Sequence, residues 1–359
     1  MEIGILTYYG VHNHGALLQA NALKTVLENM GHKVSFLSFE RSYEYISEEQ
    51  TKKYKIGLSS IPFYFNYAKE KGLGNITYNL KKRNTLNTFR KNSFNIGPRY
   101  NEFSGDLVLI GSDEVFSLEI GYNEMMYGHQ LNSKRIASYA GSFGPTTIED
   151  IENKGKASLI STGLEKFSAI GVRDKNSQTI VEQLSHKKAE LVCDPVILYG
   201  YPEEQFLYKP NDKDYILVYA YDNRMNDPKE VSAIKAYAEK SGCKLYSVGF
   251  YHKWCDKNIN ASPIELLGWI RNAKFVLTDT FHGSVYSIIC NTPMVVKLRG
   301  NANKIKFLLE EYGLSGRIIS DFGEIEKVAE EKIDFSAVSS TVSEKREASL
   351  RFLTDCVEG

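Results

Sequence analysis

The chain has 359 residues, a length typical of two domains. Hydrophobic residues make up 42% of it and charged residues 25%, as in globular proteins that bury sizeable cores. Basic and acidic residues both number 44, so the overall charge gives no reason to expect nucleic acid as a partner. The five cysteines are widely spaced and form no C-x-x-C pair, which argues against a disulfide framework and favours a reducing compartment.

The first predicted unit is a strand, a loop, a helix and a second strand. Residues Ile3–Thr7 form an apolar run, Ala16–Met30 follow helical periodicity, and Val34–Phe39 form the next strand. A unit of this kind predicts a parallel sheet, with the connecting loop at the edge that binds ligands.

That loop contains Asn13, His14 and Gly15, which we expect to contact substrate. It is not a G-x-G-x-x-G sequence, so no dinucleotide site is predicted. His12 and His14 resemble a metal-binding pair, but no carboxylate or third ligand stands nearby in the sequence. We therefore favour a polar loop that lines a substrate site, and we expect neither a metal nor another cofactor.

Residues 51–100 contain eleven lysines and arginines and a single acid, Glu70, interleaved with aromatic residues. The favoured interpretation is a basic helical insertion at about 45–100, a pair of helices with solvated lysine faces. The alternative is a surface that contacts anionic lipid or the pyrophosphate of a carrier. No recognised motif supports binding of nucleic acid.

The parallel-sheet pattern returns after the insertion. The predicted strands and helices, in chain order, are Asp106–Gly111, Arg135–Ala140, Glu149–Ser161 (helical), Phe167–Val172, Lys175–Leu184 (helical) and Glu190–Asp194. Ser112, Asp113 and Arg173 follow two of these strands and are therefore predicted at the same sheet edge as the first loop. An arginine there can hold a carboxylate or phosphate through two hydrogen bonds; the alternative is a salt bridge to Asp174 or Asp194. The alternative for Asp113 is a helix cap.

A second α/β series follows an interdomain connection at residues 199–213. Its predicted elements are the strands Tyr215–Ala220, Lys244–Val248, Phe275–Thr278 and Met294–Leu298 and the helices Asp227–Lys240, Ser262–Asn272 and Asn303–Tyr312. Thr341 and Glu344 form a predicted capping box that starts a last amphipathic helix, Val342–Cys356. We expect this helix to dock back across the domains.

The segment Phe275–Ser284 is the strongest candidate for the centre of a site. A strand turns into a helix through Asp279, Thr280, His282 and Gly283. The free N–H groups at the start of the helix can bind an anion, and a histidine there can transfer a proton near neutral pH. The alternative is a capped helix with a histidine that serves only the structure.

Three cations, Lys297, Arg299 and Lys304, follow the next strand. They either neutralise a phosphate at the histidine turn or lie on the surface. Taken together, the elements predict two Rossmann-like α/β domains, residues 1–200 and 201–335, facing each other across a cleft, with a C-terminal helix over 336–359.

Six motifs resemble those of the polysaccharide pyruvyl transferase family. They are N-H-G-A-L-L-Q-A-N-A-L (13–23), D-L-V-L-I-G-S-D-E-V (106–115), S-Y-A-G-S-F-G (138–144), G-V-R-D (171–174), C-D-P-V (193–196) and T-D-T-F-H-G (278–283). Each is weak alone, but six in this order over about 270 residues are specific for the family.

The resemblance implies a fold similar to GT-B glycosyltransferases and transfer of a pyruvyl group from phosphoenolpyruvate to two hydroxyls of a sugar or lipid-linked oligosaccharide. By matching positions, His282 becomes the acid/base residue, Arg173 a clamp for the donor, and Asp113 a base or a residue that orients the acceptor. Asp279 is a third catalytic candidate. Protonation of carbon-3 of the enol and deprotonation of the attacking hydroxyls require side chains of these types.

Some family members have an arginine two residues before the histidine, where this chain has Thr280. A glycosyltransferase that uses a nucleotide sugar is therefore the alternative function, and a non-catalytic carbohydrate-binding or assembly protein is the second alternative.

The N-terminus enters a strand directly, without a signal sequence or a long apolar stretch. We expect a cytoplasmic protein, with peripheral contact at the inner face of the membrane if residues 51–100 bind anionic lipid.

Overall fold

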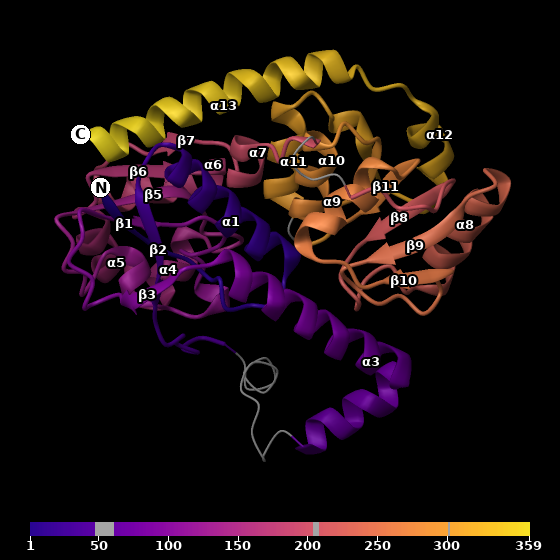
Figure 1. Cartoon of the computed structure of the whole chain (residues 1–359), viewed down its shortest axis with the longest axis horizontal. Helices are drawn as coiled ribbons and strands as arrows, with labels where there is room; N and C mark the ends of the chain where they lie inside the picture. The colour runs from indigo at the N-terminus through magenta and orange to yellow at the C-terminus, as the bar shows by residue number, and fades with distance from the viewer. Residues whose placement is uncertain (47–60, 204–207, 301) are drawn as a thin grey trace.

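The computed structural model describes residues 1–46, 61–203, 208–300 and 302–359; side chains within 61–71 lie outside this description. Two α/β domains lie side by side, and the last helix, α13 (Phe335–Glu358), runs along both of them (Figure 1). The predicted fold class of two Rossmann-like domains is confirmed.

The first domain is built on a parallel sheet with the strand order β3-β2-β1-β4-β5-β6-β7. Its strands are β1 (Glu2–Leu6), β2 (Lys33–Ser38), β3 (Ile96–Arg99), β4 (Leu107–Ile110), β5 (Arg135–Gly141), β6 (Ala169–Val172) and β7 (Glu190–Leu191). The residues of β4 are fully buried, because helices cover both faces of a parallel sheet. Edge strand β3 contains a glycine and a proline and lacks a strand-like pattern, so the sequence did not predict it.

The helices of this domain are α1 (His14–Asn29), α3 (Ile61–Ser93), α4 (Ile148–Asn153), α5 (Ala157–Leu164), α6 (Lys175–Ser185) and α7 (Pro195–Tyr199), with single 3₁₀ turns at Leu118–Ile120 and Glu124–Tyr127. The prediction of one helix over Glu149–Ser161 was wrong, because the chain turns between α4 and α5. Gly155 adopts a left-handed φ of 64° at that turn, a conformation that ends a helix.

The second domain has the strand order β10-β9-β8-β11-β12-β13, again all parallel. Its strands are β8 (Tyr215–Tyr219), β9 (Lys244–Val248), β10 (Lys257–Ile259), β11 (Phe275–Thr278), β12 (Met294–Lys297) and β13 (Ile318–Ile319). Its helices are α8 (Pro228–Lys240), α9 (Pro263–Arg271), α10 (Phe281–Ile289), α11 (Ala302–Glu311) and α12 (Ile325–Glu330), and 3₁₀ turns lie at Ser315–Arg317 and Phe322–Glu324.

The strand order reverses once in each sheet, between β1 and β4 and between β8 and β11. In sheets of this type ligands bind outside the carboxyl ends of the strands at such a reversal. The loops that begin there carry the 13–15 segment, the 112–114 segment and the histidine turn before α10. The topology therefore brings the main predicted motifs to two facing edges.

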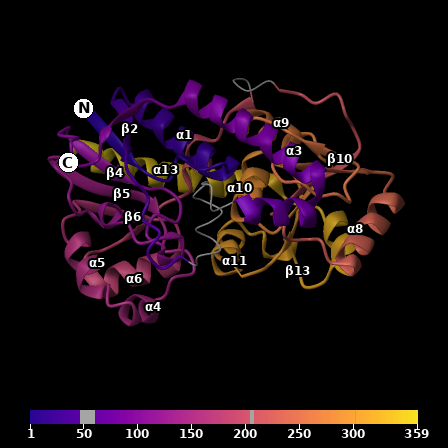
Figure 2. The ribbon, with the colours of Figure 1, turned by 90° about the horizontal axis from the view of Figure 1, so that it is seen from below.

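Within the described part of the basic insertion, residues 61–93 form α3, which consists of two helical segments, as the favoured interpretation expected, separated by a kink at Gly72, where φ is 78°. After the kink the helix runs from the second domain back to the first, and so spans both (Figure 2). The Tyr78 hydroxyl donates a hydrogen bond of 2.9 Å to the Ile259 carbonyl of the second domain. Lys82 is buried, so the expected solvated lysine face is not complete.

The aromatic residues of the basic segment, Phe63, Tyr64, Phe65 and Tyr67, lie outside the described side chains. Contact of residues 51–100 with an anionic membrane therefore stays a prediction. Among the helices in the described part of the chain, none has the length and apolar character needed to cross a membrane.

Helix α13 begins seven residues before the predicted start. Asp334 is its cap, accepting hydrogen bonds from the N–H groups of Ser336 and Ala337, whereas the Thr341 hydroxyl bonds to the Ala337 carbonyl inside the helix. Near its end the Ser349 hydroxyl accepts a hydrogen bond from the Cys193 N–H at 2.8 Å. The helix is thus attached to the segment that joins β7 to α7.

Candidate active site

A cavity of about 750 Å³ lies between the two domains, at the carboxyl edges of both sheets. Its size is within the range of roughly 300–1,000 Å³ that is usual for small-molecule sites. It is lined by the loop before α1, by the segments after β2 and β4, and by α3, α10 and α11. The charged and imidazole side chains in its wall are His12, Arg41, Arg83, Asp113, Glu114, His282 and Lys304.

His282 projects from the first turn of α10. Thr280 caps this helix, because its hydroxyl accepts the Gly283 N–H at 3.0 Å. The imidazole is 13% exposed, and its Nε2 has no hydrogen bond to a described residue but lies 3.9 Å from the Asp194 carboxylate. The ring packs against Gly15, where an added Cβ would lie 2.3 Å from Nδ1. A larger residue at position 15 would displace the imidazole.

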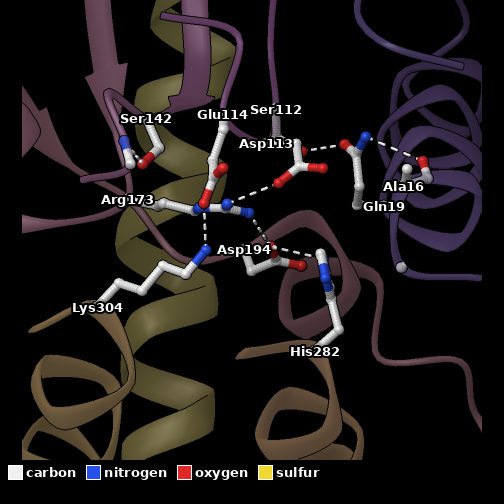
Figure 3. A network of polar contacts seen from close by, with 12 residues as sticks. Ala16, Gln19, Ser112, Asp113, Glu114, Ser142, Arg173, Asp194, His282 and Lys304 are labelled. Atoms are coloured by element: carbon white, nitrogen blue, oxygen red, sulfur yellow. Dashed lines mark hydrogen bonds and ion pairs between the residues drawn. The ribbon is translucent and has the colours of Figure 1, made fainter. Parts of the chain in front are cut away.

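Arg173 holds two carboxylates of the site in place (Figure 3). Its guanidinium lies 2.7 Å from Asp113 and 3.2 Å from Asp194, and it stacks 4.6 Å from the ring centre of Phe281. The side chain is only 1% exposed and is not part of the cavity wall. Arg173 therefore orders the two acids, which in turn face His282, and it does not reach the cavity itself.

Asp113 is ionised in this environment. Burial opposes ionisation, but the neighbouring positive charges, Arg173 foremost, outweigh it and hold the pKa of Asp113 below its usual value.

For His282, burial is the largest influence and lowers the pKa. The attraction of Asp194 and Asp113 does not restore it, because Arg173 and Lys304 repel a further positive charge. The imidazole is therefore neutral near pH 7 in the free protein.

Lys304 of α11 forms an ion pair with Glu114, which follows β4, and so connects the two domains across the cavity (Figure 3). Its ammonium lies 5.8 Å from the ring centre of Phe281. Lys304 also lines a second cavity of about 430 Å³. It is the cation of the cavity wall that stands beside the histidine turn.

Two of the three predicted loop residues lie at the site. Asn13 lines the cavity and caps α1, accepting the Gly15 N–H at 2.7 Å. His14, in contrast, points into the domain interface, where Nε2 lies 2.9 Å from the Ala261 carbonyl. Burial, and then the charge of Lys82, lowers the pKa of His14 to about 3, so it is neutral.

Ser112 and Gly283 support the site from behind. The buried Ser112 hydroxyl donates to the side-chain carbonyl of Gln19 and so ties the end of β4 to α1. At Gly283 an added Cβ would lie 2.2 Å from the Thr278 hydroxyl, so glycine is needed for α10 to pack on β11. Neither residue is part of the cavity wall.

Asp279, Lys297 and Arg299 are turned away from the cavity. The Asp279 carboxylate is fully buried 3.8 Å from both Arg224 and Arg299, and Arg299 makes two hydrogen bonds to Glu230. Lys297 donates to the Ser320 carbonyl. Their positions at strand ends place them at the correct sheet edge, but Asp279 and Arg299 belong to a separate ionic cluster and Lys297 bonds to a backbone carbonyl.

The sequence did not single out several residues of the site. Asp194, which the sequence indicates only as a partner of Arg173, is the acid nearest to the His282 Nε2. The sequence does not indicate that Glu114 pairs with Lys304, and Arg41 and Arg83 come from segments without any motif. For Asp194 a signal existed, since the acid in C-D-P-V follows a predicted strand.

The fold and the cavity between its domains define a two-domain protein of the GT-B type. Similar architectures occur in the Methanocaldococcus jannaschii UDP-GlcNAc 2-epimerase (12% identity, TM-score 0.51, 96% of this chain and 99% of that chain covered). The Arabidopsis thaliana UGT89C1 in complex with UDP-L-rhamnose is also similar (11% identity, TM-score 0.51, 99% and 98% covered). At these identities the likeness concerns the fold alone.

A model of the polysaccharide pyruvyl transferase family matches residues 13–298. The chain belongs to this family, as the six motifs predicted. The search among curated proteins found no match. The match spans both domains, from the loop before α1 to the end of β12, and therefore includes His282, Asp113 and Arg173.

We predict that Arg173→Met lowers the free energy of unfolding by about 3–5 kcal/mol, because it leaves the carboxylates of Asp113 and Asp194 buried without a counter-charge. Equilibrium unfolding in urea measures the change. The control is Arg351→Met, which removes an exposed arginine paired with Glu347 and should leave the midpoint unchanged. An equal midpoint for the wild type and Arg173→Met would contradict this role.

We also predict that Asp279 makes stability depend on pH. Burial, which outweighs the attraction of Arg224 and Arg299, raises the pKa of Asp279 to about 6. In the unfolded chain the pKa is about 3.9, so between these values the folded protein holds a proton that the unfolded chain has lost. Stability attributable to Asp279 is therefore present at pH 4 and lost as the pH rises to about 6.

Asp279→Asn removes this titration. The unfolding free energy of the variant, relative to the wild type, should increase by about 2–3 kcal/mol between pH 4 and pH 6.5. Urea titrations across that range measure the difference, and any constant effect of the substitution cancels. A difference that does not change with pH would show that folding leaves the pKa of Asp279 unchanged, and would contradict this prediction.

Proposed function

We propose that the protein transfers the pyruvyl group of phosphoenolpyruvate to two hydroxyls of a sugar in the synthesis of a cell-surface polysaccharide. The products are a cyclic ketal and inorganic phosphate. The observation that carries this proposal is His282 at the N-terminus of α10, in an interdomain cavity beside the ionised Asp113, in a chain of the pyruvyl transferase family. The acceptor is a sugar or a lipid-linked oligosaccharide.

The donor carries a carboxylate and a phosphate, so it needs positive partners. Two are available beside His282: the N–H groups of the first turn of α10 and the ammonium of Lys304. Lys297 and Arg299 are engaged elsewhere, and Arg173 is enclosed by its two acids. Lys304 would leave Glu114 and pair with the donor. It would thereby supply the positive charge that Thr280, in the place of the arginine of some family members, cannot.

The bound donor also supplies the proton that the reaction requires. Its negative charges raise the pKa of the neutral His282, so donor binding favours the imidazolium. The imidazolium protonates carbon-3, and the resulting cation at carbon-2 is attacked by the first sugar hydroxyl. His282, now neutral, takes the proton from that hydroxyl, while Asp113 accepts a hydrogen bond from the acceptor and orients it.

The second half of the reaction removes phosphate. The carbon–oxygen bond to the phosphate breaks with protonation of the leaving group by His282, and the second hydroxyl attacks carbon-2. The proton of this hydroxyl returns to the imidazole, so two bonds to sugar oxygens form and no oxidant or reductant is required. One histidine that gains and loses a proton is sufficient for both halves.

We predict that phosphoenolpyruvate raises the melting temperature of the wild-type protein, whereas a panel of nucleotide sugars does not. At a concentration 100 times its dissociation constant the donor should stabilise the fold by ~2.7 kcal/mol.

His282→Gln should lower phosphate release from phosphoenolpyruvate by at least ~10²-fold, because it removes the acid/base group. Differential scanning fluorimetry and a phosphate assay with a mixture of polysaccharide acceptors measure the two effects.

The control is His129→Gln, in a histidine outside the cavity that contacts the Leu159 carbonyl, and it should change neither result. Stabilisation only by nucleotide sugars would contradict the proposal and support a glycosyltransferase. If neither class stabilises the protein and His282→Gln has no effect on any measured property, the non-catalytic carbohydrate-binding alternative is favoured instead.

A further inference from the structure

We infer that the acceptor carries a negative charge, a phosphate ester or a carboxylate, and that Arg83 of α3 binds this group. The inference rests on the proposed function, because it assigns the part of the cavity that the donor does not need. Phosphoenolpyruvate has about ten non-hydrogen atoms, far fewer than a cavity of about 750 Å³ holds. The remaining space belongs to the second substrate.

The acids in the cavity wall are already neutralised. Among the lining residues only Asp113 and Glu114 carry carboxylates. Arg173 pairs with the first and Lys304 with the second. Arg83 lines the same cavity, and within the described part of the chain it has no hydrogen bond and no ion pair. Its positive charge is therefore left for a ligand.

The residue before it, Lys82, reinforces this charge. Its side chain is more than nine-tenths buried, yet no hydrogen bond or ion pair to a described residue is found for its ammonium, which lies 4.5 Å from the ring centre of Phe250. Phe250 is part of the cavity wall. Burial lowers the pKa of Lys82 to about 8, and Asp222 acts in the opposite direction. Near pH 7 Lys82 is therefore still protonated, and positively charged, in most copies of the protein.

His12 indicates that the electrostatic potential at this wall is positive. It lines the cavity and bonds to Asn87 of α3 at 3.0 Å. Burial is the main cause of its lowered pKa, and the charges of Arg83, Arg90 and Lys82 lower it further. The α3 side of the cavity is thus a positive surface, which attracts an anionic sugar more strongly than a neutral one.

Aromatic side chains beside this surface suit the ring of a sugar. Tyr9, Tyr221 and Phe250 line the cavity with the positive groups of α3. Aromatic rings offer broad apolar faces together with, in tyrosine, a hydroxyl for hydrogen bonding. A sugar ring against these faces, with its charged group at Arg83, would hold its hydroxyls in the same cavity as His282. A guanidinium binds phosphate and carboxylate through two parallel hydrogen bonds, so either charged group fits.

The test compares matched forms of several hexoses: the free sugar, the sugar 1-phosphate and the uronic acid. Isothermal titration with the full chain, saturated with phosphoenolpyruvate, gives the dissociation constant of each form. We expect at least one charged form to bind about tenfold or more tightly than its neutral counterpart, which corresponds to ~1.4 kcal/mol. A preference shown by the 1-phosphates alone identifies a phosphate, and one shown by the uronic acids alone identifies a carboxylate.

Arg83→Gln should abolish this preference while leaving the stabilisation by phosphoenolpyruvate unchanged. The matched control is Lys81→Gln, which removes a charge from an exposed position on α3 outside the cavity wall and should keep the preference. Lys82→Met should weaken binding of the charged form to a lesser extent, and melting curves verify that each variant is folded.

Three results would overturn the inference. Equal binding of neutral and charged forms is one, and an unchanged preference in Arg83→Gln is the second. The third is loss of donor stabilisation in Arg83→Gln, which would assign Arg83 to phosphoenolpyruvate. Failure of the proposed function itself is distinguishable, because the wild type would then show no stabilisation by phosphoenolpyruvate before any sugar is added.

Discussion

The structure of the site depends on one buried guanidinium shared by two carboxylates. Arg173, at the end of β6, lies between Asp113, which follows β4, and Asp194, which precedes α7. A buried arginine is tolerated only with counter-charges, and each buried acid needs a cation in turn. The three side chains therefore hold one another, and through them three segments of the first domain are fixed around the histidine of the second.

This arrangement determines the charge of His282. The triad carries a net charge of about −1, which attracts a proton to the imidazole, but burial dominates and keeps it neutral in the free protein. An anionic donor adds negative charge beside the ring and raises the pKa of His282 further than Asp113 and Asp194 alone do. Binding of the donor therefore produces the imidazolium that protonates it. The Lys304–Glu114 ion pair adds a second consequence, because a donor that draws Lys304 away from Glu114 also loosens a link between the domains.

Much of this could be predicted from the sequence, because parallel strands deliver the residues that follow them to a common edge. That rule placed Asp113 and His282 in the wall of one cavity, with Gly15 packed against the imidazole. It does not give the direction of a side chain, which packing decides. Asp279 directly follows β11 yet faces Arg224 and Arg299, and Lys297 faces the Ser320 carbonyl. Arg83 could not be predicted, since it reaches the cavity only because α3 crosses to the second domain. The start of α13 was missed because Asp334, and not Thr341, supplies the cap.

The central claim is that donor binding converts a neutral His282 into the acid of the reaction. The most direct measurement is the pKa of the His282 imidazole by NMR of the ¹⁵N-histidine-labelled protein, with His282→Gln for assignment, without and with saturating phosphoenolpyruvate. The account predicts a pKa below 6.5 in the free protein and a clear rise in the complex. A pKa that stays the same when the donor is bound would contradict it.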